Sequence, residues 1–202
     1  TLLNASKAAP ASHAGQRVVT ELASMDADSR RWPSDTEFMA GLLDANLYNN
    51  VYRARLRALL TGLENHLRTE KTEDQSPLSV RNGLQVEHLL PQRWQEHWPV
   101  DFNDHGAVAA RQDAVHRLGN LTLLTQKLNG SISHGAWSKK AGEIGKHALL
   151  LLTTSSVFGT PPNLDQTLAS TWKDGWDEER ILARSVYLAS EAVAAWPRPD
   201  AR

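Results

Sequence analysis

The sequence predicts an α+β fold that is mostly α-helical. Apolar residues recur at helical spacing towards both ends of the chain. Residues 83–135, which lie between them, lack this periodicity and contain two short apolar runs typical of strands. With 41% hydrophobic and 22% charged residues, the composition fits a folded globular protein rather than a disordered one. The length of 202 residues is sufficient for one domain of good size.

The first third of the chain is predicted to be helical. Apolar residues at helical spacing predict a helix over 13–25, and Ser34 is typical of a helix N-cap that opens the next one. The clearest helix is expected over 51–67, where leucines form one apolar stripe. Arg53 and Arg57 lie off this stripe, and we interpret that basic face as ordinary solvated surface.

The middle of the chain is predicted to alternate between strands and irregular segments. In chain order we expect a polar linker over 71–82, a strand over 84–90 ended by Pro91, a helical turn over 91–98, a loop over 101–106, a second strand over 121–125 and a short helix over 126–132.

The last third returns to helices. We expect a helix over 137–152, a loop over 155–164 and a closing helix over 177–196. The whole chain is then one compact domain, with an N-terminal helical part (1–82), a central core with its following helix (83–152) and a C-terminal loop and helix (153–202).

Composition excludes several classes of protein. Because the chain has no cysteine, it has no disulfide framework, no thiolate nucleophile and no cysteine-based metal site. No apolar run approaches the length of a membrane span, so we expect no membrane partner and a cytoplasmic location by default. The net charge of −1 gives no overall sign of nucleic-acid binding. The start at Thr1 without Met favours a piece of a longer protein or a processed chain.

The pair Glu87-His88 is the sharpest chemical signal. An imidazole can take a proton from water, and a carboxylate is a hard ligand for Mg²⁺ or Mn²⁺. Adjacent residues on a regular strand point to opposite faces, so the two side chains can share a site only if the strand ends or bends here, as Pro91 allows. A polar strand end with a surface ion pair is an equally good interpretation of these residues alone.

Two asparagines form the second signal. Asn120 and Asn129 flank the second predicted strand and the helix after it. A carboxamide can brace a loop by hydrogen bonds or offer its oxygen to a hard cation. Taken alone, a turn asparagine and a helix-capping asparagine explain them as well.

The motifs EHLLPQ (87–92) and RLGNLTLLTQKLN (117–129) together resemble the HNH, His-Me finger or ββα-metal, nuclease motif. The closer resemblance is to the C-terminal domain of GmrSD-type restriction enzymes, because Trp137-Ser138-Lys139-Lys140 also matches that family's later aromatic–x–Lys-Lys/Arg motif. The resemblance covers about residues 30–197. It implies an embedded ββα-metal motif and a divalent-metal-dependent DNA endonuclease that nicks, as the effector of bacterial restriction or anti-phage defence.

The resemblance also implies residue roles. His88 corresponds to the general base, Glu87 and Asn129 to the metal ligands, and Asn120 to the asparagine that braces the loop of His88. The final position of the motif holds Asn129 instead of histidine, which favours Mg²⁺ or Mn²⁺ over Zn²⁺. Related proteins often carry a nucleotide-hydrolysing sensor domain for modified DNA, and no P-loop motif occurs in this chain.

Local charge points to the expected DNA contacts. Residues 114–147 hold five cations and one acid within a chain of net charge −1. We expect phosphate contacts with double-stranded DNA from Arg117, Lys127, Lys139 and Lys140. Two alternatives remain open: a degenerate HNH-like domain that only binds nucleic acid or a partner, and a helical interaction domain whose motifs match by accident.

Overall fold

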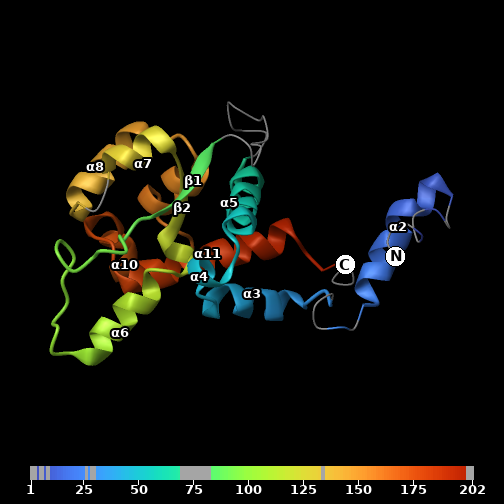
Figure 1. Cartoon of the computed structure of the whole chain (residues 1–202), viewed down its shortest axis with the longest axis horizontal. Helices are drawn as coiled ribbons and strands as arrows, with labels where there is room; N and C mark the ends of the chain where they lie inside the picture. The colour runs from blue at the N-terminus through green and yellow to red at the C-terminus, as the bar shows by residue number, and fades with distance from the viewer. Residues whose placement is uncertain are drawn as a thin grey trace.

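The computed structural model describes residues 4, 7, 10–25, 27, 31–68, 83–132 and 135–198. Within them the chain is mostly helical, with one two-stranded antiparallel sheet (Figure 1), which confirms the predicted α+β class. The strands are β1 (Leu84–His88) and β2 (Leu121–Thr125). The α-helices are α2 (Ala14–Ala23), α3 (Asp35–Asp44), α4 (Leu47–Asn50), α5 (Arg53–Leu67), α6 (His105–Ala114), α7 (Gln126–Ile132), α8 (Trp137–His147), α9 (Leu151–Thr153), α10 (Gln166–Ser170) and α11 (Glu178–Ala195). Short 3₁₀ turns are η1 (Ala11–His13), η2 (Leu118–Asn120) and η4 (Trp172–Asp174), and η3 (Thr154–Phe158) is a π-helical turn.

Two predicted helix starts are confirmed by their caps. The Ser34 hydroxyl accepts a hydrogen bond from the Glu37 amide, and the Glu37 carboxylate accepts one from the Ser34 amide at 2.8 Å. This reciprocal capping box satisfies two amide donors that the helix leaves unpaired. At α11 the Asp177 carboxylate accepts a hydrogen bond of 3.0 Å from the Arg180 amide.

Other predicted boundaries are wrong. The helix expected from residue 51 begins at Arg53, because Val51 and Tyr52 have extended backbone and separate α4 from α5. The helix expected over 137–152 is interrupted, since Ala148 and Leu150 are extended. The helical turn expected in 91–98 does form, because the Trp98 amide donates to the Trp94 carbonyl oxygen at 2.8 Å, whereas η3 occupies the beginning of the expected 155–164 loop. The predicted linker over 71–82 lies outside the described residues.

Helix α6 was not predicted. Its sequence, HGAVAARQDA, is rich in alanine and has only a weak apolar stripe. Alanine favours a helix by propensity, but it gives little of the periodic contrast on which sequence reading depends. Its buried residues are Arg111 and Ala114, so burial here includes a charged side chain.

The two faces of the hairpin carry different members of the Glu87-His88 pair. Strand β1 ends at His88, two residues before the predicted end. In the antiparallel register Val86 lies opposite Leu123 and His88 opposite Leu121, whereas Glu87 lies opposite Thr122. Since directly opposed residues share a face, His88 and Glu87 lie on different faces of the hairpin.

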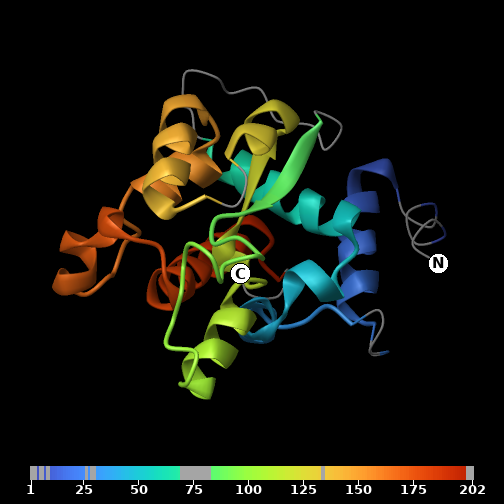
Figure 2. The ribbon, with the colours of Figure 1, turned by 60° about the vertical axis from the view of Figure 1, so that its left-hand side comes forward.

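Helices cover both faces of the hairpin. Helix α5 packs on the face that carries Leu121 and Leu123, in a leucine-rich cluster shared with α11. Helix α7 packs on the other face, where Leu124 and Leu128 join a second cluster rich in tryptophan. Figure 2 shows the hairpin between α5 and α7. Strand β2 is therefore buried on both sides apart from its last residue.

The closing helix α11 fixes the start of β2 through polar contacts. The fully buried Arg184 donates hydrogen bonds to the carbonyl oxygens of Gly119 and Leu121, which flank Asn120. Burial lowers the pKa of Arg184 to about 9. At Gly119 an added Cβ would overlap the carbonyl oxygen of Ile181, so α11 approaches more closely than any side chain would allow.

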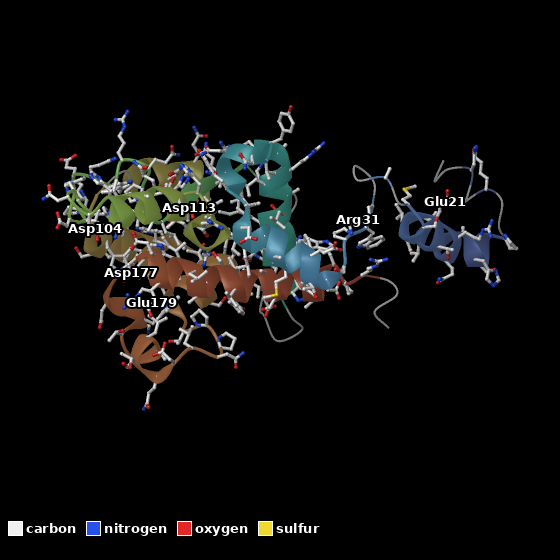
Figure 3. The ribbon with its side chains drawn as sticks, turned by 90° about the horizontal axis from the view of Figure 1, so that it is seen from below. Glu21, Arg31, Asp104, Asp113, Asp177 and Glu179 are labelled. Atoms are coloured by element: carbon white, nitrogen blue, oxygen red, sulfur yellow. The ribbon has the colours of Figure 1, made fainter. Side chains whose placement is uncertain are left out.

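Helix α2 lies apart from the rest of the chain in Figures 1 and 3, and it has no buried residues. No helix among the described residues is long and apolar enough to cross a membrane.

We expect Gly119→Ala to lower the free energy of unfolding by about 3 kcal/mol, because the added methyl group must displace backbone of α11. Gly142→Ala is the matched control, since an added Cβ in the middle of α8 meets no atom within 4 Å. That change should leave stability unchanged or raise it by up to ~1 kcal/mol. Urea unfolding of both variants checks the prediction, and equal effects would contradict it.

Candidate active site at the end of the hairpin

A pocket of about 330 Å³ opens at the end of β1. It is lined by Glu87, His88, Pro91, Gln92 and Arg93. The structure therefore brings the predicted acidic–histidine pair to one pocket, although the two residues belong to opposite faces of the hairpin. The strand ends at His88, which is the condition that sequence reasoning required for a shared site.

His88 is enclosed by aromatic rings. It is 4% exposed, its ring centroid lies 4.1 Å from that of Tyr48 in an edge contact, and His116 lies 5.6 Å away. The side-chain amide nitrogen of Gln92, which can only donate, lies 3.4 Å from Nδ1, so this contact is a hydrogen bond only when Nδ1 is unprotonated. Nε2 is buried without a hydrogen-bond partner among the described residues. A buried polar atom without a hydrogen-bond partner costs free energy.

This environment keeps His88 neutral. Burial, followed by the charges of His116, Lys140 and Arg53, lowers the pKa of His88 to about 3. The neutral imidazole at physiological pH can accept a proton. Because the folded pKa lies below the ordinary value of about 6.5, His88 contributes to stability above pH 6.5, and this contribution is lost as the pH falls towards 3.

Glu87 forms a buried ion pair with Lys140 of α8. Lys140 is fully buried, and its ammonium group donates to Glu87 Oε1 at 2.8 Å and to the carbonyl oxygen of His88. Burial lowers the pKa of Lys140, whereas the attraction of Glu87 raises it. One ammonium group therefore holds both the Glu87 carboxylate and the backbone of the next residue.

Asn120 uses its whole carboxamide to brace the loop after His88. Its Oδ1 accepts hydrogen bonds from the Leu90 amide at 2.7 Å and from Trp176 Nε1 at 3.1 Å. Its Nδ2 donates to the carbonyl oxygens of Leu90 and Val115, both at 2.8 Å. The side chain is fully buried, and these four bonds satisfy its two donors and two acceptor positions. The Leu89 amide also donates to the Asn120 carbonyl oxygen.

Asn129 lies on α7 beside the Glu87 face of the hairpin. Its Nδ2 donates a hydrogen bond of 3.0 Å to Gln85 Oε1, and Gln85 shares its face of β1 with Glu87. This bond fixes the orientation of the carboxamide. Asn129 Oδ1 accepts no hydrogen bond from the described residues. Glu87 Oε2 likewise accepts none.

The four cations expected to contact DNA are placed very differently. Lys140 is enclosed by the ion pair with Glu87, a position that does not suit a contact with phosphate. Arg117 forms an ion pair with Asp113 at 2.6 Å. Lys127 and Lys139 are exposed on α7 and α8.

Sequence reasoning did not find several neighbours of the site. Tyr48 and Trp176 contact His88 and Asn120 from distant parts of the chain. Nothing in the local pattern around either residue points to the site, because only the fold brings them there. His116, whose ring lies 5.6 Å from that of His88, was also not among the site residues selected from the sequence.

Comparison with known proteins identifies the family of the chain. The fold and the pocket define a mostly helical domain in which a hairpin ends in a carboxylate, a neutral histidine and a bracing asparagine. The family described as GmrSD restriction endonucleases, C-terminal domain, matches residues 32–191. The chain belongs to this family and is therefore a restriction endonuclease domain, whose substrate is DNA. Searches of curated proteins and of solved structures found no match.

We expect Lys140→Met to lower the free energy of unfolding by about 3 kcal/mol, because it leaves the partly buried Glu87 carboxylate without its counter-charge. Lys146→Met in the same helix is the control, since Lys146 is exposed and its ion pair with Glu143 lies at the surface. Thermal and urea unfolding measure both changes. Equal stability of the two variants would show that the buried ion pair is not needed by the fold.

Proposed function

We propose that the chain is an HNH-type endonuclease domain that hydrolyses phosphodiester bonds of double-stranded DNA with Mg²⁺ or Mn²⁺. The observation that carries this proposal is His88, a buried neutral histidine whose Nε2 has no partner among the described residues and which shares a pocket with Glu87. The order β1, β2, α7 supports a ββα-metal motif, because a hairpin is followed directly by a helix that carries Asn129.

The free oxygens near the hairpin fit a hard cation. Glu87 Oε2 and Asn129 Oδ1 accept no hydrogen bonds from described residues, and both groups belong to the α7 side of the hairpin. No group of three or more histidine, aspartate or glutamate side chains that could hold a metal occurs among the described residues. One carboxylate and one amide suit Mg²⁺, which keeps several waters, and do not suit the tetrahedral nitrogen and sulfur ligation of Zn²⁺.

In the proposed reaction, the roles of the chain's own residues follow from their contacts. His88 accepts the proton of the attacking water, for which its ring must be neutral. Asn120 is a positioning residue that holds the loop after His88. Lys140 holds the Glu87 carboxylate and the His88 carbonyl oxygen in place through the hydrogen bonds of its ammonium group. The bound cation would stabilise charge on the scissile phosphate and the leaving oxygen.

A single site of this kind cuts one strand, so the domain is expected to nick. As the effector of a restriction or anti-phage system, it would act with a nucleotide-hydrolysing domain that recognises modified DNA.

A second candidate function has its own supporting observation. Lys140 already neutralises Glu87 through an ion pair of 2.8 Å. If the ammonium keeps this carboxylate from binding a cation, the domain is a degenerate HNH-like module that binds nucleic acid or a partner. The two candidates differ in whether Mg²⁺ or Mn²⁺ supports cleavage.

We expect the protein to nick supercoiled plasmid in the presence of Mg²⁺ or Mn²⁺, and EDTA to abolish the reaction. His88→Ala should reduce the rate by at least about 100-fold, because it removes the general base. Gel electrophoresis of open-circular product measures the rate, and circular dichroism verifies that the variant is folded. If His88→Ala protein cut at the wild-type rate, the catalytic role of His88 would be wrong, and absence of cutting by the wild type would favour the binding module.

Asn129→Ala should raise the Mn²⁺ concentration for half-maximal binding by about tenfold or more, because it removes a proposed ligand. Isothermal titration calorimetry without DNA measures binding independently of activity. Gln126→Ala is the matched control, since Gln126 is exposed at the beginning of the same helix. An affinity equal to that of the wild type would remove Asn129 from the ligand set.

A further inference from the structure

Three arginines gather at the beginning of α5. Arg53, Arg55 and Arg57 fall within the first five residues of the helix, and no acidic residue occurs from residue 45 to residue 63. Arg53 and Arg55 are exposed. Among the described residues, none of the three arginines forms an ion pair with a carboxylate. Together with the exposed Tyr52, we call these residues the α5 arginine patch.

This arrangement is unfavourable for the isolated domain. The N-terminal end of a helix carries partial positive charge, so cations there are repelled rather than attracted. Arg53 and Arg57 also stand four residues apart, where like charges destabilise a helix. The Nε atom of Arg57 is buried without a hydrogen-bond partner among the described residues. The part of the chain that the structure describes supplies no compensating acid, so an external anion would relieve the repulsion.

Aromatic rings hold two of these arginines in place. The Arg53 guanidinium lies 3.4 Å from the centroid of the Tyr48 ring and donates a hydrogen bond of 3.1 Å to the Tyr48 carbonyl oxygen. Arg55 lies 5.6 Å from the ring of Tyr52, which is 79% exposed. A guanidinium that is stacked on a ring keeps its outer edge free for phosphate, and less side-chain entropy is lost on binding.

The patch is continuous with the pocket. The Tyr48 ring that carries Arg53 also contacts the His88 ring, with centroids 4.1 Å apart. Arg93 is exposed and lines the pocket. Figure 3 shows acidic side chains on another part of the surface, over α6 and the beginning of α11, where Asp104, Asp113, Asp177 and Glu179 are labelled.

We propose that the α5 arginine patch binds the phosphate backbone of double-stranded DNA beside the pocket, so that the duplex lies across α4 and α5. The proposal rests on the proposed function, because it takes the pocket at His88 as the place of cleavage. Charge complementarity to a polyanion and the direct contact between Tyr48 and His88 identify the occupant and its position. The strand approaching His88 would thus be held by cations that the sequence-based selection did not include.

The test is fluorescence anisotropy with a labelled duplex of about 25 base pairs in EDTA, where no cleavage occurs. Arg53→Gln with Arg55→Gln should weaken binding at least about tenfold at low salt and reduce the salt slope, d log K/d log[salt], by about 2, because two phosphate contacts are lost. Without DNA its melting temperature should change little, because relief of the repulsion at the helix N-terminus offsets the lost contacts of Arg53 with Tyr48.

Two double variants with the same loss of charge serve as comparisons. Lys146→Gln with Lys173→Gln changes exposed lysines far from α5 in sequence and should alter the affinity less than threefold. Lys127→Gln with Lys139→Gln tests whether DNA binds instead to the exposed lysines of α7 and α8. The proposal is overturned if that variant loses as much affinity as the arginine variant, or if the arginine variant keeps wild-type affinity and slope. The proposal would also be overturned if the arginine variant lost affinity for duplex RNA but kept its affinity for duplex DNA.

The experiment separates this proposal from the nuclease proposal. Cleavage by the wild type together with unchanged binding by the arginine variant would overturn only the binding surface. Binding through the patch without any metal-dependent cleavage would overturn only the nuclease assignment.

Discussion

The site depends on one buried side chain, the carboxamide of Asn120. Its four hydrogen bonds join the loop after His88, the segment that follows α6 and Trp176 near the closing helix. Because each partner is buried and specific in direction, the loop cannot move without breaking several bonds at once. This constraint explains how neighbouring residues on opposite faces of a strand can serve one pocket. The strand is held fixed where it ends, and the chain turns immediately after His88.

The net charge of a segment does not show which of its cations are free to bind an anion. The segment 114–147 is the most basic in sequence terms, but one of its cations is buried against Glu87 and another is paired with Asp113. Arg53 and Arg57 were interpreted as solvated surface, and in the structure Arg53 is exposed, Arg57 is half-buried, and neither has an acidic partner among the described residues. Counting charges per segment cannot tell an internal counter-ion from a free cation, because that difference depends on burial and on contacts distant in sequence.

Sequence reasoning succeeded where local chemistry decides the structure. The cap at Ser34, the start of the closing helix at residue 177 and the two apolar runs that became β1 and β2 were all predictable from short-range rules. It failed for α6, whose alanines give little periodicity, and for the surroundings of His88, which come from α4 and from the end of α6. The histidine itself could be selected from the sequence. Its low pKa could not, because desolvation is a property of the packed fold.

The polar contacts at the start of β2 also affect when the site can form during synthesis. Trp176, which bonds to the Asn120 side chain, lies 56 residues later in the chain, and Arg184, which bonds to the carbonyl of Gly119, lies 65 residues later. A ribosome therefore releases both strands of the hairpin well before the groups that lock them in place. Until Trp176 and α11 have emerged, Asn120 and the start of β2 lack these later contacts, although the bonds of Asn120 to Leu90 and Val115 can already form. The hydrogen-bond network around the candidate site is therefore complete only when almost the whole matched region has been translated.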